Sequence, residues 1–279
     1  MWHHLQKTIL TAALLMLLSK AAVAQDFRIH TLVFDELKPA SNRDAQKMQK
    51  PRIVARSLSL FHAGKAYDYL HEIGEVIVFE PVHRRFIILN TKSEMATTVD
   101  FDQIKHLLKL ARQASQEHVA ELKQEKAAAP LRFQLNPRFK EHYNEQRQRL
   151  TLSSPYVHYE VHCAEAKRPE AVDAYLRYAD WMCRLNYVLH PQLLLPEPRL
   201  ALNAILRRKQ LIPTEVELQA SIETRIHLRA EHNIVWKLDA TDRSQIHHWE
   251  TLLKSKNTRH VPFREYQRAQ LVSQLNKRR

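Results

Sequence analysis

Histidine is the residue type best suited to metal chemistry in this chain, which contains 17 histidines. His158 and His162 lie four positions apart with Glu160 between them, in an alternating segment, YVHYEVHC, that predicts a β-strand. Even spacing on a strand directs the three side chains to one face, and imidazole and carboxylate groups are metal ligands. Four strand residues span about 13 Å, so the two histidines could not share an ion. We expect a hydrogen-bonded polar face, with a metal held by a neighbouring pair such as Glu160 and His158 as the alternative.

A second histidine group, formed by His247, His248 and His260, is a poorer metal candidate, because adjacent residues on a helix point about 100° apart. The chain also contains only two glycines, Gly64 and Gly74, and both fall at expected hairpin turns. A phosphate-binding loop or a dinucleotide fingerprint needs several glycines close together. The sequence therefore excludes those nucleotide sites, and we expect no cofactor.

Nucleophilic catalysis has no clear motif in the sequence. The chain contains no G-x-S-x-G segment. Cys163 follows His162 directly, and neighbouring strand residues point to opposite faces, so the two cannot act as nucleophile and base. The sequence leaves the catalytic residues unknown.

Basic residues cluster in the segment RFKEHYNEQRQR, where Arg138, Lys140, Arg147 and Arg149 are interleaved with aromatic side chains. Such a segment predicts an anion-binding surface, with a solvated basic face as the alternative. Further basic groups occur at Arg84 and Arg85, at Arg207 to Lys209 and at Lys277 to Arg279.

The first 24 residues resemble a cleavable secretory signal peptide. An apolar run from Thr8 to Leu18 precedes the small residues Ala22, Val23 and Ala24. This run is shorter than the roughly 20 residues that span a bilayer, although Lys20 leaves a retained anchor as the alternative. We expect an exported chain, periplasmic or extracellular, with no transmembrane segment after cleavage.

Export decides how the net charge of +13 is interpreted, because cleavage would remove only two lysines and no acid. An exported protein rarely meets nucleic acid, so that partner is not expected. The expected partners are anionic lipid, a cell-wall polymer or an envelope protein. An oxidising compartment also permits a disulfide between Cys163 and Cys183, with two unpaired buried thiols as the alternative.

The elements that must position these residues are short strands and amphipathic helices. Period-two runs predict strands, in hairpins and meanders, over 26–34, 52–62, 65–70, 75–81, 84–90, 94–99, 149–154, 156–163, 214–222, 223–231 and 233–239. Helical periodicity predicts helices over 100–126, with Asp100 as N-cap, and over 169–186, 199–209, 242–254 and 263–275, with a short surface helix over 138–149. Residues 25–279 thus predict a single α+β domain, in which a large curved antiparallel sheet carries helices on its concave face.

Three segments, FHAGKAYDYL, GEVIVFEPVHRRFIILN and ADWMCRLNYVLHP, resemble stretches found in a family of exported bacterial proteins without an assigned function. The expected topology is also similar to the half-barrel of the periplasmic lipoprotein carrier LolA and its relatives. That likeness is one of architecture, and architecture alone does not give function.

The expected function is that of an exported, non-enzymatic binding or scaffold protein of the cell envelope, which holds an apolar ligand or docks a partner. The alternative is a hydrolase acting on cell-envelope polymers. Its carboxylates would come from pairs such as Glu75 with Glu80 or Asp239 with Asp242, because glycosidase carboxylates are brought together by the fold.

Overall fold

The structure is a computed structural model that describes residues 26–37, 51–165, 168–191, 194–222 and 224–277. The predicted signal peptide, residues 1–24, lies outside the described residues. None of the described helices is both long enough and apolar enough to cross a lipid bilayer.

Twelve strands form one open sheet in the order β12-β6-β5-β4-β3-β2-β1-β11-β10-β9-β8-β7. All neighbouring strands pair antiparallel except β12 and β6, which are parallel. The strands are β1 (Phe27–Asp35), β2 (Arg52–His62), β3 (Lys65–Leu70), β4 (Glu75–Glu80), β5 (Arg85–Asn90), β6 (Met95–Asp100), β7 (Lys140–Asn144), β8 (Arg149–Ser153), β9 (Val157–Glu165), β10 (Leu211–Ser221), β11 (Arg225–Val235) and β12 (Arg259–His260).

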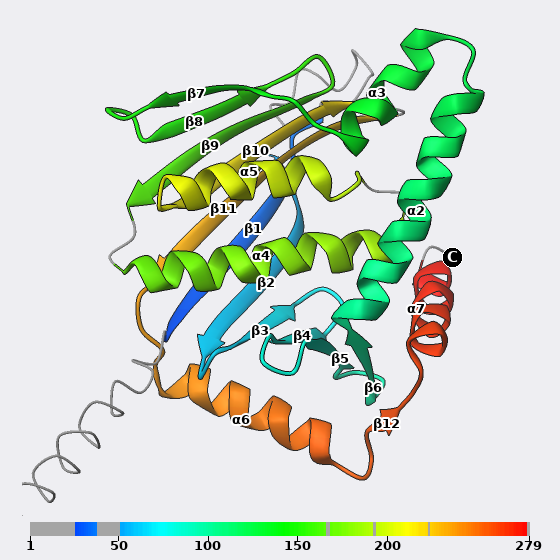
Figure 1. Ribbon diagram of the computed structural model, residues 1–279. Helices are drawn as coiled ribbons and strands as arrows, with labels where there is room; N and C mark the ends of the chain where they lie inside the picture. Colours follow the sequence, from blue (N-terminus) through cyan, green and yellow to red (C-terminus); the bar gives the residue numbers. More distant parts are fainter. Residues whose placement is uncertain (1–25, 38–50, 166–167, 192–193, 223, 278–279) are drawn as a thin grey trace, which may run out of the picture.

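Helices pack on the face of this curved sheet that Figure 1 shows in front. They are α2 (Phe101–Glu121), α3 (Glu125–Leu135), α4 (Pro169–Leu189) and α5 (Glu197–Arg208). The apolar stripe of α4 closes a core in which the Phe27 and Phe61 rings stack with centroids 4.1 Å apart, and Tyr178 meets Phe61 edge-on at 5.4 Å. The predicted α+β architecture is confirmed.

A smaller core lies on the opposite face of the sheet, over β2 to β6. There α6 (Ala240–Lys254) packs Ile246 and Trp249 against apolar side chains of these strands. The helix begins with a capping box, in which Asp239 and Asp242 exchange side-chain and backbone hydrogen bonds. Arg28 on β1 binds both carboxylates, at 2.5 and 2.7 Å, and so fixes the start of α6 to the sheet.

The last helix, α7 (Phe263–Lys277), returns to the larger core. Its Tyr266 side chain is buried and donates a hydrogen bond of 2.5 Å to Glu75 on β4. Because helices pack against both faces of the sheet here, all six residues of β4 are buried.

Both glycines adopt the left-handed backbone conformation that the hairpins require, with φ of 76° at Gly64 and 67° at Gly74. Several non-glycine residues at tight turns also have positive φ, among them Ala63 in the same turn as Gly64. The prediction for the glycines is confirmed.

Three local predictions differ from the structure. Residues 138–149 form β7 and the turn into β8 instead of a surface helix, because β7 pairs with β8, whose Leu150 and Leu152 are fully buried. Three closing strands were predicted over 214–222, 223–231 and 233–239. The structure has two long strands there, β10 and β11, because β11 continues without a break over Arg225–Val235. Asp100 precedes α2 but makes no side-chain capping bond, and that helix ends at Glu121.

Candidate functional site

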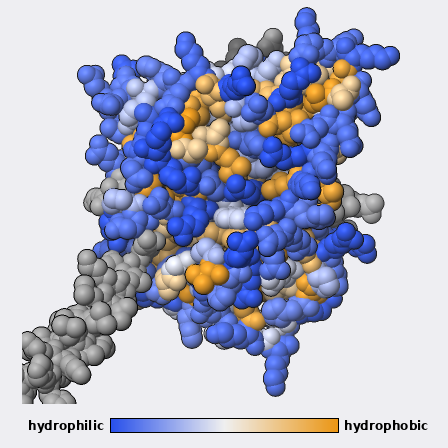
Figure 2. Space-filling model, viewed as in Figure 1, coloured by the Kyte–Doolittle hydropathy of each residue, from blue (hydrophilic) through white to orange (hydrophobic). Residues whose placement is uncertain are grey.

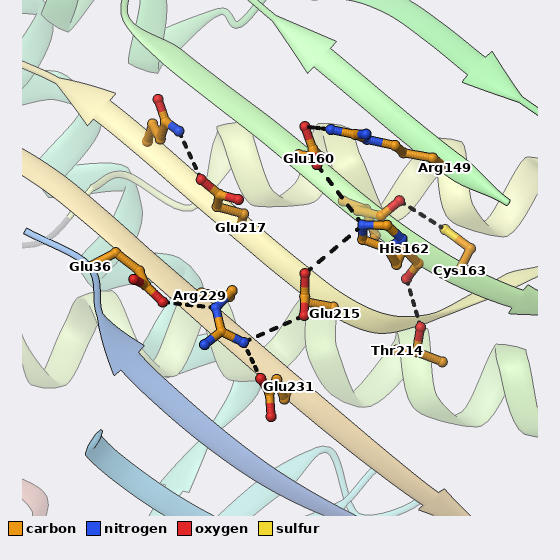
Figure 3. A network of polar contacts seen from close by, with 12 residues as sticks. Glu36, Arg149, Glu160, His162, Cys163, Thr214, Glu215, Glu217, Arg229 and Glu231 are labelled. Carbon is orange, nitrogen blue, oxygen red and sulfur yellow. Dashed lines mark hydrogen bonds and ion pairs between the residues drawn. The ribbon is translucent and has the colours of Figure 1, made fainter. Parts of the chain in front are cut away.

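The face of the sheet opposite α4 and α5 is polar along β8 to β11. Pairing between neighbouring strands aligns polar side chains in two rows across this face. One row runs through Glu160, Glu217 and Arg229, and the other runs through Arg149, His162, Glu215 and Glu231. We call this surface the outer face. Its defining residues, most of which are labelled in Figure 3, are Glu36, Arg149, His158, Glu160, His162, Glu215, Glu217, Arg225, His227, Arg229 and Glu231.

Arg229 is the centre of the outer face. Its Nε donates to Glu36 at 2.8 Å, and its Nη1 reaches Glu215 at 3.5 Å and also pairs with Glu231. The guanidinium lies 4.4 Å from the centroid of the Phe34 ring, a cation–π geometry. Partial burial lowers the pKa of Arg229, but its hydrogen bonds to Glu36 and Glu231 outweigh that effect and raise the pKa above its ordinary value.

A second set of contacts lies beside it on β8, β9 and β10. Arg149 forms an ion pair with Glu160, and the His162 Nε2 atom lies 3.9 Å from Glu160 and 4.0 Å from Glu215. The imidazole of His162 is 46% exposed, so it sits between two carboxylates and in contact with water. The histidine and the two glutamates are therefore accessible to a ligand that approaches from solvent.

Glu217 accepts hydrogen bonds from its own strand, β10, and from the neighbouring strand β11. His227 Nε2 lies 2.7 Å from its carboxylate, and Gln219 Nε2 donates to it at 2.8 Å. Burial raises the pKa of Glu217, but these two hydrogen bonds outweigh burial and hold the pKa below its ordinary value. Glu217 therefore stays ionised at neutral pH.

A hollow of about 560 Å³ lies at one end of the outer face. Glu36, His158, Gln219, Arg225 and His227 line it together with residues of the β8–β9 connection and of the adjoining ends of β10 and β11. Its volume lies within the range that small ligands or single large side chains occupy in binding sites. The outer face is therefore a flat polar surface that ends in a recess.

Negative charge predominates on the outer face. On β8 to β11 and at the end of β1, five glutamates face three arginines, Arg149, Arg225 and Arg229, on a chain whose net charge is +13. Within the described ranges, no three histidine, cysteine or acidic side chains gather closely enough to hold a metal ion. The metal alternative for Glu160 with His158 and the histidines of α6 and β12 thus gain no support from the geometry.

The predicted anion-binding residues do not all share one environment. Lys140 lies at the start of edge strand β7, while Arg147 lies in the turn at its other end. Arg138 is exposed in the connection before β7. Arg149 points to the outer face and pairs with Glu160. An anion site shared by all four residues stays a prediction. One of the four, Arg149, already has Glu160 as its anionic partner.

Neither predicted carboxylate pair faces a common cleft. Glu75 and Glu80 are five positions apart on β4, so they point to opposite faces: Glu75 contacts α7, and Glu80 accepts from Arg85 at 2.7 Å on the other side. Asp239 and Asp242 serve the helix cap described above. These contacts give the pairs structural roles.

The two cysteines are free, so the structure does not contain the disulfide that the sequence permitted. Cys163 is 7% exposed within the larger core, and the thiol of Cys183 donates to the Asp180 carbonyl at 3.2 Å. Burial raises the pKa of each thiol to about 12. Such thiols are poor nucleophiles and act as small core residues.

Sequence reasoning found the β9 part of the outer face and missed the rest. Alternation in YVHYEVHC singled out Glu160 and its neighbouring histidines, whose polar strand face is confirmed. It did not single out Glu215, Glu217 or Arg229, although the same alternation in TEVELQASI and ETRIHLRAE was the available signal. Their role depends on which strands pair, and β10 joins β9 only after two helices intervene.

The chain matches no protein-family model and no curated protein.

Proposed function

We propose that this chain is an exported, non-enzymatic binding protein of the cell envelope that docks a basic segment of a partner protein on its outer face. The observation that supports this most is the excess of glutamates over arginines on a partly exposed sheet face of an otherwise strongly basic chain. A negative surface of this kind attracts lysine- and arginine-rich segments and increases their association rate. Export itself rests on the signal-like sequence of residues 1–24.

The size of the outer face suits a weak, reversible contact. The strands β8 to β11 and the neighbouring β1 are spaced about 4.8 Å apart, and each contributes roughly seven residues at about 3.3 Å, which gives an area of about 500 Å². Stable interfaces bury about 800 Å² per partner, and transient ones bury less. A complex of this size that depends on charge should dissociate readily as salt increases.

The opposite face of the sheet is less suited to a ligand. Between the strands and α4, the space is filled by side chains such as Phe27, Phe61 and Tyr178, which contact one another at ring-packing distances. A bulky apolar ligand would have to displace this packing, at a cost of several kcal/mol for each large side chain. This favours docking on the outer face over storage of an apolar ligand under the helices.

The test is binding of a fluorescent lysine-rich peptide to the processed protein, measured by anisotropy at low and at physiological salt. The double variant Glu160→Gln/Glu217→Gln removes two of the five negative charges, and we expect about tenfold weaker binding, equivalent to about 1.4 kcal/mol.

The matched control is Glu125→Gln/Glu265→Gln. It removes the same charge from two exposed glutamates that pair with arginines elsewhere, at 71% and 51% side-chain exposure. We expect the control to bind like the wild type. Equal losses in the two double variants would show that only the total charge matters and would contradict docking on the outer face.

A further inference from the structure

A second hollow lies on the other side of the sheet, where α2, α4 and α5 meet. It has a volume of about 610 Å³, and the residues that line it include Lys105, Arg177, Trp181, Arg184 and Arg207. The surface over these helices is largely hydrophilic in Figure 2. We call this hollow the helix groove.

The spacing of three residues on α4 places their side chains on the side of the helix that faces the helix groove. Arg177, Trp181 and Arg184 occupy positions i, i+4 and i+7 of α4, which face the same way on a helix. Lys105 comes from α2 and Arg207 from α5, so three helices bring their cations to one place. The two acidic residues that also line the groove are Asp173 and Asp180.

The positive charge of the groove is only partly balanced. Asp180 accepts from Arg207 at 2.7 Å and from Asn203 at 2.8 Å, so Arg207 neutralises that carboxylate. Arg184 donates to the Asp180 backbone carbonyl at 2.6 Å, which is a neutral acceptor. Arg177 is exposed and, within the described part of the chain, has no carboxylate at ion-pair distance.

Lys105 does have an acidic neighbour, Asp102, at 3.2 Å, but that carboxylate is 73% exposed. Surface pairs of this kind are worth less than about 1 kcal/mol. Lys105 is therefore free to exchange Asp102 for a stronger anion. With Arg177 and Arg184, it gives the groove three cations that can serve a ligand.

Trp181 holds two of these cations in place. Its indole stacks on Phe101 with centroids 3.6 Å apart and planes 17° apart. The Arg184 guanidinium lies 5.2 Å from the indole centroid, and the Lys105 ammonium lies 6.0 Å from it. Cations held over an aromatic ring lose less freedom when an anion binds, which increases affinity.

We propose that the helix groove is a binding site for a phosphate-bearing organic anion. Guanidinium groups bind phosphoryl oxygens through paired hydrogen bonds, and two arginines with one lysine offer more donors than a single carboxylate needs. The volume fits a ligand of small-molecule size and exceeds what an inorganic ion fills. Both a free phosphate ester and the headgroup of a phospholipid have this chemistry.

The test uses the full processed chain and two probes, glycerol 3-phosphate by calorimetry and phosphatidylglycerol vesicles by co-sedimentation. Vesicles of phosphatidylcholine, a zwitterionic lipid without net charge, are the comparison. In Arg177→Gln/Arg184→Gln we expect at least tenfold weaker binding of the probe that the wild type binds. Binding of both probes would indicate recognition of the phosphate ester alone. Binding of the vesicles alone would indicate a lipid headgroup.

The control, Lys123→Gln/Arg132→Gln, removes the same charge at exposed positions outside the groove, where Arg132 pairs with Glu125. We expect it to bind as the wild type does, and circular dichroism should show that both variants are folded. Failure of the wild type to bind either probe would overturn the proposal. So would an equal loss in the groove variant and the control.

Discussion

Arg229 donates to Glu36 at 2.8 Å although 193 positions separate the two residues in the chain. The contact exists because β1 pairs with β11, which brings the first described strand next to one of the last. It joins β1 to β11 in the middle of the sheet, on the outer face.

Arg229→Met should destabilise the fold by about 2 kcal/mol. It keeps the apolar contact with Phe34 but leaves Glu36, Glu215 and Glu231 without their shared cation, and partly buried carboxylates that lose a partner are costly. Urea unfolding measures the change. Arg225→Met, an exposed arginine on the same strand, is the control and should change stability by less than about 0.5 kcal/mol. A similar loss in both would show that the ion cluster contributes nothing.

Removing the Phe61 ring should cost more, about 3–5 kcal/mol for Phe61→Ala. The ring stacks on Phe27 and receives Tyr178 edge-on, so its loss opens a cavity in the larger core. Val82→Ala is the control, because Val82 is 86% exposed. Urea unfolding of both variants measures the loss of stability. If Phe61→Ala lost no more stability than the control, the larger core would have to be loosely packed.

The contribution of Glu75 to the free energy of unfolding should fall as pH rises through the acid range. Burial raises its pKa, although the hydrogen bond from Tyr266 opposes the shift. The unfolded chain therefore releases this proton at lower pH than the folded chain does, and ionisation at higher pH costs the folded state free energy.

Glu75→Gln keeps an acceptor for Tyr266 and removes the charge. We expect it to be more stable than the wild type at pH 7 and to lose this advantage at pH 4, as measured by urea midpoints at both values. Glu72→Gln, whose carboxylate is 39% exposed, should show no such dependence. An equal advantage at the two pH values would contradict ionisation of Glu75 as the cause.

Cys163 and Cys183 should react slowly with iodoacetamide while the chain is folded. With a pKa of about 12, each thiol contributes about 1000-fold less thiolate at pH 8 than an ordinary cysteine. Mass spectrometry of alkylated protein, native and urea-unfolded, measures both rates. Fast native labelling would contradict the burial of these thiols, and an unlabelled unfolded chain would show that they are bonded to each other.

The sequence predicted the architecture because its signals are local. Alternation and turn residues around Gly64 and Gly74 define the meander of β2 to β6, and the helical stripe of Pro169–Leu189 predicted α4. The prediction failed at residues 138–149, where charged side chains hide an edge strand that only its pairing with β8 stabilises.

The outer face was predictable only in part for the same reason. Alternation on β9 placed Glu160 and its histidines on one face, but nothing local connects them with Arg229 or Glu36. Those contacts come from the strand order, which depends on long-range pairing across the helices α4 and α5. Likewise, the groove around Trp181 needs three helices to converge, and no single segment shows it.

The central claim is that the outer face is the docking surface, and amide NMR of the processed protein titrated with a lysine-rich peptide tests it most directly. We expect the largest shift changes at His158, His162 and Gln219, with none at Trp181 in the helix groove. Changes that cluster on α4, or changes spread evenly over the chain, would contradict the account.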